Sequence, residues 1–314
     1  LRGLDRRTVY YDQPAGRSLL QATSCPTRMI HPRNCFRTGM AKVKTDVGSS
    51  DRANDEIREI EVKLDFTPNA LASILYRQGN TQVLVCVTKA PSLPRWFPRD
   101  SDRGWVHAEY SLLPGSTDTR FRRERNGAKG RTMEIERLVA RSLRGAVDLE
   151  HLGPVALTVD CDILNADGGT RCASITAANI ALRIAVRRLI FTGECLPKDK
   201  RLTKEEIRKG VEKETLSKEE MASHEMSVMP NDVAALSVGL VDGHVWTDLD
   251  YILDSNADVD MNVVMTSAGD FVEVQGTGEE ATYSREELDL LINAAEEGIS
   301  KLHRLQKDIV SDAS

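Results

Sequence analysis

One stretch, residues 155–175, most constrains the fold because it joins three kinds of local structure. It reads VALTVDCDILNADGGTRCASI. Residues 158–164 are mostly apolar and β-branched, which predicts a largely buried strand. Residues 165–169 have turn chemistry, with two glycines that can adopt positive φ. From Cys172 the apolar residues recur at roughly helical spacing. The stretch therefore predicts a strand that passes through a Gly-Gly turn into a helix.

The Gly-Gly turn has the composition of an anion-binding site. The first turn of a helix has unpaired N–H groups and the positive end of the helix dipole. Glycines let the backbone approach an anion, and the Thr170 hydroxyl can donate a hydrogen bond. Arg171 adds a positively charged guanidinium group that can donate two parallel hydrogen bonds. The spacing and the lysine of a Walker loop are absent. These residues alone leave two interpretations open: a phosphate cradle, or a tight turn followed by a solvated arginine.

Composition limits the class of protein. The chain has 314 residues, of which 40% are hydrophobic and 29% charged, and no apolar run is long enough to span a bilayer, so we expect no membrane partner. The net charge of −6 excludes a global basic field for nucleic acid but allows a local basic surface. The six cysteines show neither a CxxC pair nor a framework spacing, which favours reduced thiols.

The first 50 residues differ in composition from the rest. Residues 1–50 are rich in arginine and poor in acids, which is typical of an organellar transit peptide. The alternative is an untranslated or disordered extension, with translation starting at Met40. We exclude residues 1–50 from the fold and predict one domain over residues 51–314. The expected location is the cytoplasm, or a mitochondrion or plastid if the leader directs import.

Strand and helix signals predict an α+β domain, because hairpins come in two batches and each batch is followed by helices. Strands are expected at 60–64, 70–76, 82–88, 105–113, 233–241, 245–250, 261–266 and 271–275. An amphipathic helix is expected after residue 131, and a second one closes the chain after a capping box at Ser284 and Glu287.

Residues 192–230 are dense in lysine and glutamate. Thr203 with Glu206, and Ser217 with Glu220, fit capping boxes, which predicts two short surface helices. We find no apolar face wide enough for a core. The segment is therefore predicted to be an insertion on the outside of the fold, either decorative or for binding a partner.

Residues 119–131, TRFRRERNGAKGR, form a basic loop that leads directly into the first amphipathic helix. Such a run is commonly a solvated loop, and the alternative is a functional basic surface. Arg131 lies at the predicted helix start, where the helix dipole disfavours a cation unless an anion also binds there. Arg131 is therefore a candidate anion ligand.

The segment DSNADVDMN carries Asp254, Asp258 and Asp260. Asp254 and Asp260 flank a turn-like segment just before an apolar strand. Carboxylates brought together at the mouth of a strand can hold Mg²⁺. The alternative is that Asp254 caps a turn while Asp258 and Asp260 are surface charges.

Several long motifs occur together in this chain. They read GWVHAEYSLLP at 104–114, GRTMEIERLVARSLRGAVDL at 130–149, DCDILNADGGTRCASIT at 160–176, DLDYILDSNADVDMNVVMT at 248–266 and EVQGT at 273–277. Together they resemble the ribonuclease PH family over about residues 58–306, apart from 192–230. The resemblance implies a compact α+β domain of the ribosomal protein S5 domain 2-like type, assembled as a homohexamer that is a trimer of dimers. It also implies a phosphorolytic 3′→5′ exoribonuclease that trims tRNA precursors and other RNAs with inorganic phosphate and releases nucleoside diphosphates.

The resemblance also implies roles for single residues. The family's phosphate ligands fall on Arg131, Gly169, Thr170 and Arg171, and its metal-binding and catalytic acids, which bind Mg²⁺, fall on Asp254 and Asp260. Two RNA-binding arginines of the basic loop match Arg120 and Arg123, whereas a third one, expected after Leu-Pro, is Gly115 here. Two alternatives remain: a catalytically silent, RNA-binding ring subunit of an exosome-like assembly, and a hydrolytic metal nuclease that needs no phosphate cradle.

Overall fold

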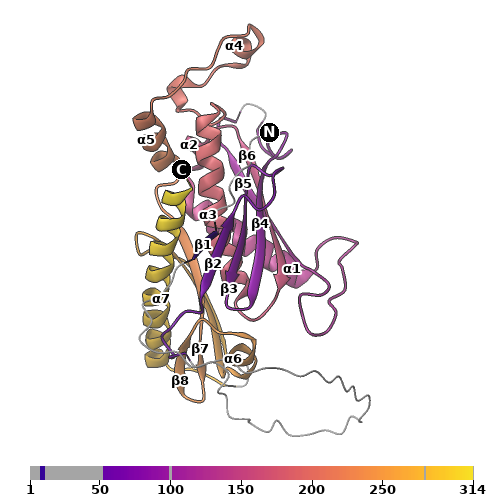
Figure 1. The fold of residues 1–314 in the computed structure, drawn as a ribbon, viewed down its shortest axis with the longest axis vertical. Helices are drawn as coiled ribbons and strands as arrows, with labels where there is room; N and C mark the ends of the chain where they lie inside the picture. Colours follow the sequence, from indigo (N-terminus) through magenta and orange to yellow (C-terminus); the bar gives the residue numbers. More distant parts are fainter. Residues whose placement is uncertain (1–7, 11–51, 99–100, 279–280, 314) are drawn as a thin grey trace, which may run out of the picture.

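The structure is a computed structural model and describes residues 8–10, 52–98, 101–278 and 281–313. Its strands form two sheets that lie one above the other along the long axis of the molecule (Figure 1). Of the leader, the structure describes a three-residue strand, β1, which pairs antiparallel with β2. The rest of the prediction for residues 1–50 lies outside the described residues.

The larger sheet has six strands in the order β1-β2-β3-β4-β6-β5. They are β1 (Thr8–Tyr10), β2 (Ile60–Leu64), β3 (Ala72–Gln78), β4 (Thr81–Lys89), β5 (Trp105–Leu112) and β6 (Ala156–Asn165). β5 and β6 are parallel, and the other neighbours are antiparallel. The predicted hairpin at Gly79 and the predicted strand before the Gly-Gly turn are confirmed. Alternate side chains point into the core, as Val83, Val85 and Val87 of β4 do.

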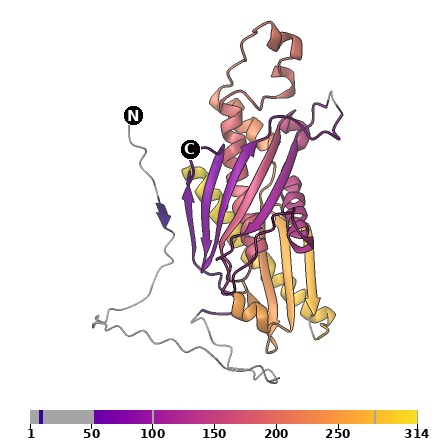
Figure 2. The same ribbon diagram turned by 90° about the vertical axis from the view of Figure 1, so that its right-hand side faces the viewer.

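The smaller sheet has four antiparallel strands in the order β10-β9-β7-β8. They are β7 (Val233–Val241), β8 (His244–Thr247), β9 (Val259–Thr266) and β10 (Phe271–Gly278). The closing helix α7 (Arg285–Asp312) packs on β7 and begins at the predicted capping box of Ser284 and Glu287. Figure 2 shows α7 running behind both sheets.

The helix α3 (Thr170–Phe191) lies at the centre of the molecule. It is apolar almost all round, which is the pattern of a helix buried on every side. The Thr176 hydroxyl accepts a hydrogen bond from the Ala235 N–H of β7 at 3.1 Å, and the Gln306 amide of α7 donates to the Thr176 carbonyl at 3.0 Å. These contacts fix the N-terminal part of α3 where the two sheets meet. The other long helix, α1 (Gly130–Ala146), covers the larger sheet with the predicted apolar face of Ile135, Leu138, Val139 and Leu143.

Residues 192–230 contain the two predicted short helices, α4 (Lys204–Arg208) and α5 (Lys218–Val228), after a 3-10 turn, η1 (Lys198–Lys200). Both predicted capping boxes form. α4 stands away from the body of the protein (Figure 1). The sequence showed no apolar face wide enough for a core in this segment, but Leu216, Val228 and Met229 are buried in the main hydrophobic cluster. They are buried because α5 folds back onto α3 and the short helix α2 (Leu149–Leu152).

The buried His224 of this segment makes the stability of the protein depend on pH. His224 of α5 is buried, and burial together with the nearby charge of Arg201 lowers its pKa to about 4 from 6.5. The folded protein therefore takes up this proton later than the unfolded chain does. The contribution of His224 to stability is complete above pH 6.5 and is lost as the pH falls towards 4. The loss is up to about 3 kcal/mol, because one pKa unit corresponds to about 1.4 kcal/mol.

We therefore expect His224→Gln to flatten the decline of the thermal midpoint between pH 6.5 and 4. Thermal unfolding of both proteins across this range measures the effect. Parallel curves would show that His224 does not titrate with unfolding.

Two further features complete the fold. The four cysteines in the described residues, Cys86, Cys161, Cys172 and Cys195, are free thiols. Within the same part of the chain, no helix combines the length and the apolar composition needed to cross a membrane.

Candidate active site

A cavity of about 1200 Å³ opens where the two sheets meet. Seven of the eight residues singled out from the sequence line it: Arg120, Arg131, Gly169, Thr170, Arg171, Asp254 and Asp260. The glycine-backed turn and the two acids, which are up to 91 positions apart in the chain (260 minus 169), therefore face the same space.

The Gly-Gly turn has the backbone predicted for it. Gly168 and Gly169 have φ values of 72° and 61°, in the left-handed region that favours glycine. A Cβ atom on Gly168 would lie 2.5 Å from the Leu249 carbonyl oxygen. The turn thus packs directly on the backbone that precedes α6 (Tyr251–Asn256), and only glycine fits there.

Two helices begin at the cavity, and their first turns share an unusual composition. Neither α1 nor α3 has a side chain that caps its first turn, and neither has an acidic residue there. Each instead carries an arginine at its second position, Arg131 in α1 and Arg171 in α3. Two positive dipole ends and two guanidinium groups at one cavity repel each other unless an anion lies between them. The arrangement suits a phosphate group.

Tyr110 of β5 supports this part of the site. Its hydroxyl donates a hydrogen bond to the Thr170 hydroxyl oxygen at 2.9 Å. Burial raises the pKa of Tyr110, against the effects of Thr170, Arg131 and Arg171. Tyr110 therefore stays protonated at neutral pH, and the Thr170 hydroxyl keeps its own proton for an anion. The sequence pattern marked Tyr110 only as part of a strand.

Arg171 is held by a chain of side chains from other elements. Its Nη1 donates to the Gln275 Oε1 of β10 at 3.2 Å, and the Gln275 Nε2 donates to the Glu134 Oε1 of α1 at 3.0 Å. Gln275 thus turns the guanidinium towards the cavity and uses its amide to link β10 with α1. In the sequence, Gln275 stands out only as part of the EVQGT motif, from which no role for it follows.

The two acids come from neighbouring elements. Asp254 lies on α6 and Asp260 on β9, so the predicted turn-like segment is the end of a short helix followed by a brief connection. Cys172, in the first turn of α3, donates to the Asn262 Oδ1 of β9 at 3.1 Å. Burial raises the pKa of the Cys172 thiol, and the Asp260 charge raises it further. The acid of β9 therefore lies close to the first turn of α3.

The donor set fits a magnesium ion. In the described part of the chain, no group of three or more His, Cys, Asp or Glu side chains could hold a metal ion. Asp254 and Asp260 offer carboxylate oxygens to one cavity. Mg²⁺ usually binds through one or two carboxylates and completes its shell with water and substrate phosphates.

The basic loop divides between two spaces. Arg120 lines both the main cavity and a second cavity of about 690 Å³ within the loop itself, whereas Arg123 lines the second cavity and not the main one. Arg123 also lies near Asp162 of β6, whose pKa is raised by burial and partly lowered again by the Arg123 charge. Gly115 lines the main cavity, and a Cβ there would meet open space.

Comparison with known proteins identifies the family. The model of the 3′ exoribonuclease family, domain 1, matches residues 56–187, and that of domain 2 matches residues 232–298. The chain belongs to this ribonuclease PH family. The two matches leave out residues 188–231, which include the predicted insertion.

Individual members of the family are similar over most of their length. Ribonuclease PH of Corynebacterium kroppenstedtii is 46% identical over 267 residues, which are 84% of this chain and 93% of the relative. Ribonuclease PH of Rhodopirellula baltica is 44% identical over 259 residues, or 82% and 95%.

Solved structures show the same fold. A chain of the Archaeoglobus fulgidus exosome with RNA bound to the active site has a TM-score of 0.60 at 23% identity, covering 81% of this chain and 90% of that one. Rice Rrp46 has a TM-score of 0.59 at 15% identity, covering 83% and 98%. The predicted α+β ribonuclease PH fold is confirmed.

Proposed function

We propose that the cavity holds inorganic phosphate beside the 3′ end of an RNA and uses it to cleave the last phosphodiester. The chain is a phosphorolytic 3′→5′ exoribonuclease that trims RNA 3′ ends, including those of tRNA precursors, and releases nucleoside diphosphates. One observation carries the assignment of the site: two uncapped helix starts with arginines and two aspartates line a single cavity.

The first half of the cavity binds the attacking phosphate. Arg131, Arg171, the Thr170 hydroxyl and the backbone at Gly169 hold the phosphate oxygens. One of these oxygens forms a bond to the terminal phosphorus, and the bond from that phosphorus to the preceding 3′ oxygen breaks. The 3′ oxygen takes up a proton, which either Asp254 or Asp260 can relay. Since both reactants are anionic, positioning and charge neutralisation account for most of the rate enhancement.

The second half of the cavity would hold Mg²⁺ through Asp254 and Asp260. When bound, the ion supplies positive charge that offsets the charge on the scissile phosphate and the departing oxygen. The remaining ligands come from water and from the RNA.

The basic loop binds the RNA backbone in this proposal. Arg120 contacts the strand inside the cavity, and Arg123 contacts it further out. We also propose that the chain assembles into a ring, as a hexamer made of three dimers, because structural neighbours of the same fold are parts of exosomes. In a ring, local arginines can face the RNA although the net charge of the chain is −6.

Loss of either loop arginine tests the RNA contact. We expect Arg120→Ala and Arg123→Ala to raise the KM for RNA and to reduce the slope of log KM against log salt by about 1, because one phosphate contact is lost. Arg120→Ala should have the larger effect, since Arg120 alone of the two lines the main cavity.

The matched control is Arg208→Ala, because Arg208 is an exposed arginine of α4 outside the cavity. Salt slopes that are the same in the wild type and in all three variants would rule out a role of the loop in RNA binding.

The activity itself is tested with an RNA that carries a 3′ extension. We expect trimming with inorganic phosphate and Mg²⁺, and none when phosphate is left out. Equal trimming without phosphate would indicate a hydrolytic nuclease. No trimming under any condition would indicate a silent ring subunit.

A further inference from the structure

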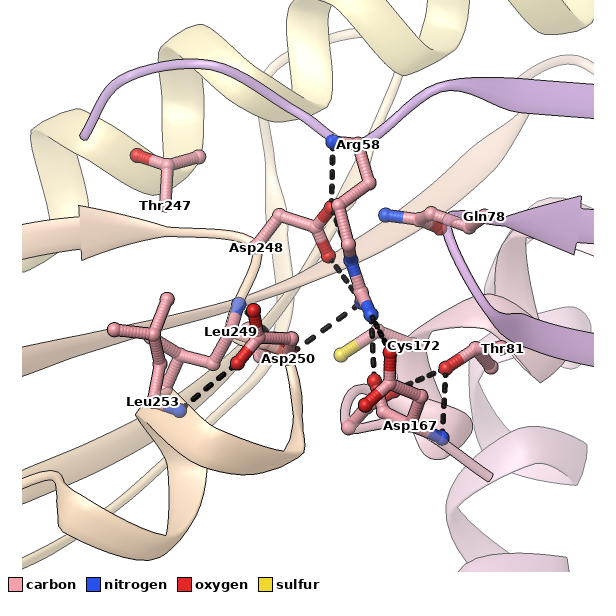
Figure 3. Close-up of polar contacts among 12 residues, drawn as sticks. Arg58, Gln78, Thr81, Asp167, Cys172, Thr247, Asp248, Leu249, Asp250 and Leu253 are labelled. Atoms are coloured by element: carbon pink, nitrogen blue, oxygen red, sulfur yellow. Dashed lines mark hydrogen bonds and ion pairs between the residues drawn. The ribbon is translucent and has the colours of Figure 1, made fainter. Parts of the chain in front are cut away.

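Arg58 and Asp248 form a buried ion pair beside the candidate site (Figure 3). The Arg58 Nη2 lies 2.7 Å from the Asp248 Oδ1, and the Nε and backbone N–H of Arg58 donate to the Asp248 Oδ2 at 2.9 and 2.8 Å. Only 9% of the Arg58 side chain and 2% of the Asp248 side chain are exposed. Burial alone would raise the pKa of Asp248, but the Arg58 charge and hydrogen bonds outweigh it and lower the pKa, so the pair is ionic at neutral pH.

The same guanidinium also holds the Gly-Gly turn. The Arg58 Nη1 donates to the Asp167 carbonyl at 2.5 Å, and the Nη2 lies 3.4 Å from the Leu249 carbonyl oxygen. Thr81 of β4 adds a second tie, because its hydroxyl donates to the Gly168 carbonyl at 2.7 Å and accepts from the Asp167 N–H at 3.1 Å. One arginine therefore joins the start of β2, the Gly-Gly turn and the segment before α6.

The backbone at Asp248 is itself unusual. Its φ is 59°, in the left-handed region that non-glycine residues rarely adopt. The Asp248 N–H donates to the Ser237 carbonyl at 2.7 Å, and Arg52 donates to the Asp248 carbonyl. This conformation turns the chain from β8 into α6, which carries Asp254. Strained backbone that is fixed by buried contacts is concentrated at functional sites.

We infer that Arg58 is a positioning residue that sets the separation between the two halves of the active site. Arg58 belongs to the first matched part of the family and Asp248 to the second, so their pair joins the part that carries Gly169, Thr170 and Arg171 to the part that carries the acids. We call the Arg58–Asp248 ion pair the clamp. The inference rests on the proposed function, because the clamp matters only if phosphate and the two aspartates must lie at a fixed distance from each other.

A merely structural ion pair is the competing explanation, and the chain offers a matched control for it. Arg183 of α3 is 8% exposed and pairs with Asp232, with the Arg183 Nε 2.7 Å from the Asp232 Oδ1. Arg183 lies thirteen residues after Thr170 on the same helix (183 minus 170), roughly 20 Å from the turn at 1.5 Å per residue. Although this pair also joins the two matched parts, Arg183 bonds Asp232, Glu225 and the backbone before β7 and not the Gly-Gly turn or the segment before α6, so its loss should affect stability without moving the site.

The experiment compares Arg58→Lys with Arg183→Lys at a temperature where circular dichroism shows both to be folded. We expect Arg58→Lys to lower kcat by about 10-fold or more and to raise the KM for phosphate several-fold, because small displacements of reacting groups are costly. Its KM for RNA should stay within about twofold of the wild type, since the basic loop is untouched. Arg183→Lys should leave all three parameters near those of the wild type. Equal kinetic effects of the two variants, or none, would overturn the inference.

A milder variant covers the case in which Arg58→Lys does not fold. Thr81→Val keeps the volume of the side chain and removes the hydrogen bonds to Gly168 and Asp167. We expect Thr81→Val to lower kcat and to raise the KM for phosphate, each by less than Arg58→Lys would. Wild-type values of both would overturn the inference.

Thermal stabilisation by inorganic phosphate separates this inference from the proposed function, because it needs no catalysis. A wild type that is stabilised by phosphate but does not phosphorolyse RNA would contradict the proposed function. In that case the clamp is still tested, since Arg58→Lys must weaken the stabilisation and Arg183→Lys must not. An active wild type with undiminished phosphate stabilisation in Arg58→Lys would contradict the clamp alone.

Discussion

Replacement of Asp254 or Asp260 by asparagine is expected to lower kcat by about 10²-fold or more, the cost of losing one electrostatic stabiliser in an active site. Asparagine keeps the shape of the side chain and removes only the charge that would hold Mg²⁺. Both residues line the cavity next to the Gly-Gly turn. Loss of either negative charge therefore affects the place where the reacting groups would lie. Steady-state trimming at saturating RNA and phosphate, over a series of Mg²⁺ concentrations, measures the effect.

Asp258 provides the control for the two acids. It lies between them in the sequence, is exposed and does not line the cavity. Asp258→Asn should therefore retain the wild-type rate at every Mg²⁺ concentration. Wild-type rates for Asp254→Asn or Asp260→Asn at limiting Mg²⁺ would remove that residue from the metal site.

Replacement of Arg131 by alanine is expected to raise the KM for phosphate by about 10-fold or more. A charge-assisted hydrogen bond contributes about 1.5–3 kcal/mol, and 1.4 kcal/mol corresponds to a factor of ten. The KM for RNA should change by no more than about twofold, because the structure places Arg131, the last residue of the predicted basic run, in the first turn of α1 and apart from Arg120 and Arg123. Steady-state kinetics with each substrate varied in turn separates the two effects.

Arg137→Ala is the matched control, since Arg137 is exposed on the same helix and does not line the cavity. It should leave both KM values unchanged. If Arg131→Ala leaves the KM for phosphate unchanged as well, the assignment of Arg131 as a phosphate ligand is wrong.

Local signals predicted the parts of the site that depend on neighbouring residues in the chain. Gly168 and Gly169 between an apolar strand and a helical pattern can only be a turn, and the turn has the expected positive φ values. Arg131 follows a loop and precedes a periodic segment, and it occupies the first turn of α1. Such features are encoded by propensity and periodicity, which need no knowledge of tertiary contacts.

The supporting residues could not be predicted in this way. Arg58 and Asp248 are 190 positions apart, and the residues around each of them do not indicate that the two form an ion pair. Tyr110 and Gln275 likewise act through contacts made by other elements. Their roles arise from packing, which a pattern along one chain does not record.

The buried residues of the 192–230 segment were missed for the same reason. Leu216, Val228 and Met229 show no helical periodicity because they are spread over a loop and the end of α5, yet they are buried when the segment folds back. The two loop arginines stay predicted RNA contacts, and the conformation of the loop adds a difference between them: Arg120 lines the main cavity and Arg123 does not.

The central claim is that inorganic phosphate, held beside the two aspartates, attacks the RNA itself. Trimming in the presence of isotopically labelled inorganic phosphate tests this most directly, with the released nucleotides separated and analysed. The account predicts one label in the β-phosphate of every released nucleoside diphosphate. Unlabelled nucleoside monophosphates would contradict it.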